Sequence, residues 1–93
     1  MNTSKLIASH NTCAILFTDS RFDELNQKIT QLGLEKDMLG KILIKDIDKD
    51  SDFNVTELHI KSIPLVYIYK NKKLIEEVFG NYNNICDIIR LHF

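Results

Sequence analysis

The stretch that decides the fold is SIPLVYIYKNKK, at residues 62–73. A proline precedes a run of β-branched and aromatic residues at 65–69, a composition typical of a strand. Proline has no backbone N–H, so it suits the first residue of a strand rather than its interior. Polar residues 71–73 indicate a turn, and residues 74–79 return as a partner strand. The stretch therefore predicts a β-hairpin that begins at Pro64.

Upstream of the hairpin, strand and helix patterns alternate. The apolar run at 13–17 ends abruptly at polar residues, as expected of a strand buried on both faces. Asp19 or Ser20 can then cap a helix. Residues at helical spacing form its apolar face, and they are Phe22, Leu25, Ile29 and Leu32. Residues 41–47 predict a second strand.

Three further helices complete the pattern: a weak one at 3–10, a short one at 51–59 and a closing one at 81–93. Strands joined through a helix are expected to be parallel, and strands joined by a tight turn antiparallel. The sequence therefore predicts an α/β fold with a four-stranded mixed sheet, flanked by helices on both faces.

Length and composition narrow the function classes. The chain has 93 residues, which suits a single domain spanning residues 1–93. Twelve basic and 13 acidic residues give a net charge of −1, which does not favour a nucleic-acid or membrane partner. No targeting or membrane-spanning segment is evident, so we expect a cytoplasmic protein. The three histidines are scattered without metal-ligand spacing, and we expect neither a metal nor a cofactor.

The two cysteines are far apart in the sequence. Cys13 begins the first strand pattern, and Cys86 falls on the apolar face of the closing helix. We interpret both as reduced, buried thiols that act as small hydrophobic residues. A Cys13–Cys86 disulfide stays open at this point, because the geometry of the fold decides whether two cysteines can be joined. No CxxC motif is present for zinc or redox chemistry.

This order of elements, with a proline opening the third strand, resembles the thioredoxin family. Three segments carry the resemblance. Residues 45–48 are similar to the family's second strand and its acidic end, and residues 58–64 are similar to the segment that leads into its cis-proline. Residues 67–73 are similar to its hairpin. Phe79-Gly80 followed by a helix is similar to the family's ending. The resemblance covers residues 12–93 and implies a thioredoxin-like fold with a cis Ile63–Pro64 bond.

The chain departs from that family where its chemistry resides. Thioredoxins carry Cys-Gly-Pro-Cys at the start of the helix that follows the first central strand, where the helix N-terminus lowers the pKa of one thiol. Here residues 17–25 read FTDSRFDEL and contain no cysteine. Ser20 and Asp23 have the spacing of a helix capping pair, which we favour over a catalytic serine.

The missing thiol pair favours a redox-inactive domain over an enzyme, and the resemblance implies that this domain binds a protein or peptide beside the proline loop. The residues expected to contact this partner are Ser20, Arg21, Phe22, Ile63, Pro64 and Gly80. One alternative is a thiol–disulfide oxidoreductase that uses a single cysteine, Cys13 or Cys86. A second alternative is a structural subunit that assembles through the edges of its sheet.

Overall fold

The computed structural model of the chain describes residues 3–47, 63–79 and 82–93. In chain order the elements are α1 (Thr3–Ser9), β1 (Thr12–Thr18), the 3₁₀ turn η1 (Ser20–Phe22), α2 (Asp23–Leu32), β2 (Ile42–Asp46), β3 (Leu65–Lys70), β4 (Lys73–Phe79) and α3 (Tyr82–His92). The helix expected at 51–59 lies outside the described residues. The other predicted elements are confirmed within one or two residues, except that α2 begins at Asp23, so that Phe22, expected on the apolar face of this helix, lies in η1.

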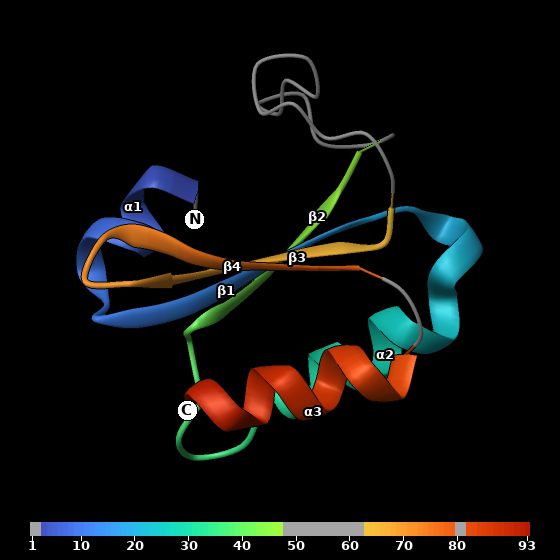
Figure 1. Cartoon of the computed structure of the whole chain (residues 1–93). Helices are drawn as coiled ribbons and strands as arrows, with labels where there is room; N and C mark the ends of the chain where they lie inside the picture. The colour runs from blue at the N-terminus through green and yellow to red at the C-terminus, as the bar shows by residue number, and fades with distance from the viewer. Residues whose placement is uncertain (1–2, 48–62, 80–81) are drawn as a thin grey trace.

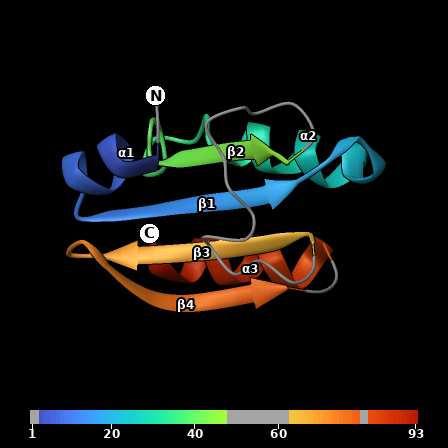
Figure 2. The ribbon, with the colours of Figure 1, turned by 90° about the horizontal axis from the view of Figure 1, so that it is seen from above.

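The four strands form one mixed sheet in the order β2-β1-β3-β4. β1 and β2 are parallel, whereas β3 is antiparallel to β1 and to β4. Figure 2 shows β1 and β3 in the middle of this sheet, with β2 and β4 at its sides. This arrangement confirms the predicted four-stranded mixed sheet, including the parallel pair joined through α2 and the antiparallel hairpin.

Helices cover both faces of the sheet, as Figure 1 shows, with α1 on one face and α2 and α3 on the other. Side chains of β1 alternate between two hydrophobic cores, since successive residues of a strand point to opposite faces. Ala14 and Leu16 join the core beneath α2 and α3, while Cys13, Ile15 and Phe17 join the core beneath α1. β1 therefore contributes side chains to both cores.

The core beneath α2 and α3 is built from helix residues at the predicted spacing. Leu25, Ile29 and Leu32 of α2 are buried, as are Ile85 and Ile89 of α3. Within the described part of the chain, no helix is long and apolar enough to cross a membrane.

The hairpin turn between β3 and β4 has the backbone geometry that tight hairpins require. Asn71 and Lys72, its two central residues, both have positive φ angles, of 52° and 69°. Two-residue turns with positive φ at both positions match the right-handed twist of the flanking strands. The turn thus fixes the pairing of Lys70 with Lys73 at the end of the ladder.

Replacing Ile29 by alanine tests the core beneath α2 and α3. Ile29 is fully buried, so truncation leaves a cavity, and we expect a loss of about 2–5 kcal/mol in the free energy of unfolding. Urea denaturation measures this loss. Gln31→Ala is the matched control, because Gln31 is exposed on the same helix, and it should change stability by less than about 0.5 kcal/mol.

Candidate functional site

The candidate site lies at the end of the sheet where β1 and β2 finish and β3 begins. Thr18 and Asp46, the last residues of the parallel strands, lie opposite one another, and the Ile47 N–H donates to the Thr18 carbonyl at 2.9 Å. Phe17 pairs with Leu65, the first residue of β3. The loop after β1 therefore lies beside the segment that precedes Leu65.

Asp19 organises this loop. Its carboxylate accepts a hydrogen bond from the Arg21 N–H at 2.9 Å and caps η1. The same carboxylate forms an ion pair with the Arg21 guanidinium, with Nη2 at 2.7 Å and Nε at 2.9 Å from Oδ2. The hydrogen bond from the Arg21 side chain is the main reason that the pKa of Asp19 is lowered. Asp19 is thus a buried carboxylate, whereas the Arg21 side chain is 71% exposed.

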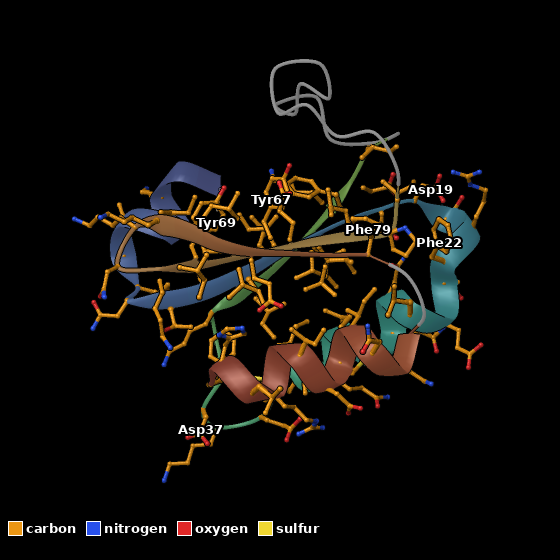
Figure 3. All side chains as sticks on the ribbon, viewed as in Figure 1. Asp19, Phe22, Asp37, Tyr67, Tyr69 and Phe79 are labelled. Atoms are coloured by element: carbon orange, nitrogen blue, oxygen red, sulfur yellow. The ribbon has the colours of Figure 1, made fainter. Side chains whose placement is uncertain are left out.

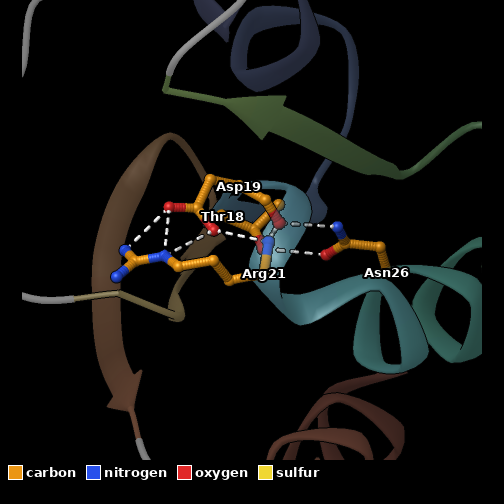
Figure 4. A network of polar contacts seen from close by, with 4 residues as sticks. All are labelled: Thr18, Asp19, Arg21 and Asn26. Carbon is orange, nitrogen blue, oxygen red and sulfur yellow. Dashed lines mark hydrogen bonds and ion pairs between the residues drawn. The ribbon is translucent and has the colours of Figure 1, made fainter.

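Asn26 of α2 fastens the loop from the other side (Figure 4). The buried Thr18 hydroxyl donates to the Asn26 side-chain oxygen at 2.8 Å, and the Asn26 amide donates to the Asp19 carbonyl at 3.1 Å. A buried polar group without a hydrogen-bond partner destabilises the folded state, so these two hydrogen bonds stabilise one conformation of the loop. β1, the loop and α2 are therefore joined by polar contacts as well as by packing.

The expectation that Ser20 and Asp23 form a capping pair is wrong. Asp19, one residue earlier, accepts the capping hydrogen bond, and Ser20 is instead the exposed first residue of η1. The residue that precedes α2 is Phe22, which makes no side-chain capping hydrogen bond. The 3₁₀ turn causes the difference, because it separates the polar residues after β1 from the first turn of α2.

The residues expected to contact a partner differ in exposure. Arg21 projects its guanidinium, with its central carbon 5.5 Å from the centre of the Phe22 ring. Phe22 is half-buried and packs against the core beneath α2 and α3. Ile63 is half-buried against the other core, Pro64 is buried, and the bond between them is cis. Gly80 lies outside the described residues.

Phe79 is a candidate site residue that the sequence analysis did not name. It is the last residue of β4, pairs with Leu65, and is 64% exposed. Figure 3 shows Phe79 at the same end of the molecule as Asp19 and Phe22. Aromatic residues are enriched in protein interfaces, so an exposed phenylalanine at this end of the sheet is a candidate contact. The signal in the sequence was the aromatic residue that ends the run at 74–79.

No family model matches the sequence, and the comparison with curated proteins found no match either. Solved structures do match. Fasciola hepatica thioredoxin superposes with a TM-score of 0.76 at 16% identity, covering 97% of this chain and 90% of that chain. Thioredoxin f2 of Chlamydomonas reinhardtii gives 0.76 at 16% identity, covering 96% and 86%. Trxlp of Edwardsiella tarda gives 0.72 at 10% identity, covering 92% and 88%.

The chain has a thioredoxin-like fold. The sequence resemblance is thereby confirmed at the level of architecture, and the loop at residues 19–22 follows the first strand of the sheet directly. In this thioredoxin-like chain that loop holds an aspartate, a serine, an arginine and a phenylalanine.

The two thiols of the thioredoxin-like fold lie on opposite faces of its sheet. Cys13 is fully buried in the core beneath α1, whereas Cys86 is half-buried against the core beneath α2 and α3. Both are free, so the disulfide that the sequence left open is not formed. Burial raises the pKa of both thiols, and at Cys86 the nearby Lys28 and Arg90 oppose that rise only in part.

Cys86 also lines a shallow groove between α2 and α3, of about 300 Å³. The groove is bordered by the ion pair between Arg90 and Glu35, whose atoms are 2.9 Å apart. Of all the residues that the structure describes, no three His, Cys, Asp or Glu side chains gather in a way that could hold a metal.

Replacing Asp19 by asparagine tests the ion pair in the loop. Because the folded-state pKa of Asp19 is lowered, the ionised carboxylate stabilises the native state at neutral pH. This contribution is present above the ordinary pKa of an aspartate and is lost as the pH falls through the lowered value. We therefore expect Asp19→Asn to reduce the free energy of unfolding at pH 7, with a difference from wild type that disappears in acid.

Urea denaturation across a series of pH values measures this difference. Asp37→Asn is the matched control, because it removes a carboxylate from the exposed loop between α2 and β2, far from Asp19 in Figure 3. A wild-type advantage over Asp19→Asn that persists unchanged into strong acid would contradict the assigned role of the ion pair.

Proposed function

We propose that this thioredoxin-like chain is a redox-inactive binding domain. It holds an extended protein or peptide segment at one end of the sheet, on the surface where residues 19–22, Ile63, Pro64 and Phe79 lie. The observation that carries the proposal is the content of the loop after β1. By resemblance, this loop is where thioredoxins carry their thiol pair, and here it holds a buried aspartate that is hydrogen-bonded to its own loop and to α2. The loop is built to keep one shape rather than to exchange disulfides.

The chemistry of the thiols supports this proposal. Thiol–disulfide exchange requires a thiolate that can reach a disulfide sulfur. Cys13 is fully buried and its pKa is raised by that burial. Cys86 also has a raised pKa, and it lies on α3 rather than on the loop after β1. A serine hydroxyl is not redox-active, so Ser20 does not replace a thiol.

The side chains at this end of the sheet favour a partner of mixed character. Phe79 offers an exposed apolar ring, and the half-buried Ile63 extends the apolar surface on the α1 side. Arg21 offers an exposed guanidinium held in place by Asp19, which lowers the conformational entropy lost on binding. A segment with apolar residues near a carboxylate fits this combination. By resemblance to thioredoxins, backbone groups of Ile63 would pair with such a segment as an added strand does.

An insulin-reduction assay separates the proposal from the single-cysteine alternative. With dithiothreitol as electron donor, we expect the chain to accelerate insulin precipitation no more than buffer does, because neither thiol is placed or ionised for exchange. A thioredoxin with an intact CxxC is the positive control. Activity that disappears in Cys86→Ser or in Cys13→Ser would establish the oxidoreductase instead.

A selected peptide tests the binding surface. Peptides are first selected on the purified chain from a random display library, and the strongest binder is synthesised. We expect its amide shift perturbations in ¹H–¹⁵N spectra to centre on residues 19–22, Ile63, Leu65 and Phe79. Phe79→Ser should weaken binding by about tenfold or more, as loss of an aromatic anchor does.

Ile75→Ser is the matched control for this experiment, because Ile75 is an exposed apolar residue on the same strand, at 45% exposure. It should leave the affinity unchanged. Perturbations confined to surfaces away from these residues, or equal loss from both substitutions, would reject the proposed site.

A further inference from the structure

In the part of the chain that the structure describes, the outer edge of β2 is open along an apolar stretch. Among the described residues, β2 has a neighbouring strand on one side only, β1. The Ala14 N–H donates to the Lys41 carbonyl, and the Ile47 N–H donates to the Thr18 carbonyl, both at 2.9 Å. Odd-numbered residues of β2 therefore direct their backbone groups toward β1. Because these directions alternate along a strand, Ile42 and Ile44 direct theirs away from the sheet.

The two edges of the sheet differ in how they discourage further pairing. Charged side chains and bulges are the usual protection of an edge strand. β4 has both, since its ladder with β3 is irregular at Ile68/Tyr69 and it carries Glu76 and Glu77. β2 has no bulge in its pairing with β1, and its two charges are Lys45, which is only 5% exposed, and Asp46 at its end. The half-buried side chains of Ile42 and Ile44 lie along this open edge.

We propose that the open edge of β2 is a self-association surface, on which a second copy of this chain pairs antiparallel through its own β2, with Ile44 opposite Ile44. When two copies are related by a two-fold axis perpendicular to the sheet, the faces covered by α1 lie on the same side of the joined sheet. With such an axis, even-numbered residues of one copy face even-numbered residues of the other, and odd-numbered residues face odd-numbered ones. Helices α2 and α3 of both copies then cover the other face of the joined sheet.

The charges of β2 disfavour one of the registers next to Ile44. With Ile44 on the axis, Leu43 faces Lys45 of the second copy and Ile42 faces Asp46, so that no like charges are opposed. The two Ile44 residues exchange backbone N–H···O=C bonds, because both direct these groups outward. With Leu43 on the axis, Lys41 would face Lys45 of the second copy, and like charges directly opposite one another are destabilising. The sequence of β2 is thus compatible with itself in the first register.

Cysteine cross-linking measures this register directly. Hydrogen-bonded residues on antiparallel strands have Cα atoms about 5.5 Å apart, within the range of about 4.4–6.8 Å that a disulfide spans. We expect Ile44→Cys, oxidised with diamide, to form a dimer that dithiothreitol reverses. Because association raises the effective concentration of the two thiols, linking should be about tenfold faster or more than in Ile75→Cys on the other edge.

The wild-type chain, with its native Cys13 and Cys86, is the background control for this oxidation. Sedimentation velocity on the wild type should show a monomer–dimer equilibrium that shifts toward dimer with concentration. Ile44→Pro should remain monomeric, since it removes an outward N–H, and circular dichroism checks its fold. A wild type that stays monomeric at millimolar concentration, or faster linking in Leu43→Cys than in Ile44→Cys, would overturn the proposal.

Discussion

Burial of β1 on both faces is the constraint on which the rest of the structure depends. A strand with apolar side chains in both directions must have a layer against each face, which requires α1 on one side and the pair α2 and α3 on the other. It must also have a neighbour along each edge, which β2 and β3 supply. Every residue from Cys13 to Thr18 is almost completely buried, so a one-residue shift would exchange the side chains of the two cores and put Ile15 and Phe17 where Ala14 and Leu16 pack.

This constraint explains why so much of the fold could be predicted from the sequence. The continuous apolar run at 13–17, the helical spacing of Leu25, Ile29 and Leu32, and the proline before residues 65–69 are each local patterns with one physical solution. The order of these patterns then leaves few topologies, because parallel strands need a crossover helix and the tight turn at 71–72 forces an antiparallel pair. The resemblance to thioredoxins rests on the same patterns, which is why it survives at 16% identity or less to the structures compared.

The site was less predictable, because its geometry depends on contacts between residues whose spacing suggests something else. Ser20 and Asp23 have the spacing of a capping pair, yet the strand runs to Thr18 and a 3₁₀ turn follows, so the capping role passes to Asp19. The sequence does carry a signal at Asn26, a polar residue at helical spacing from Phe22 and Ile29, where an apolar residue would be ordinary. The exposure of Phe79 depends on its place at the end of an edge strand, which no local pattern specifies.

The sheet also separates the two sulfur atoms into compartments with different access to solvent. Cys86 is half-buried and lines a surface groove that is open to a small alkylating reagent, whereas Cys13 has no exposed surface. Alkylation of Cys13 therefore requires the layer over β1 to open, and its rate under native conditions measures the free energy of that opening. The alkylation rate of Cys86 thus follows local movement between α2 and α3, and that of Cys13 follows the separation of α1 from the sheet.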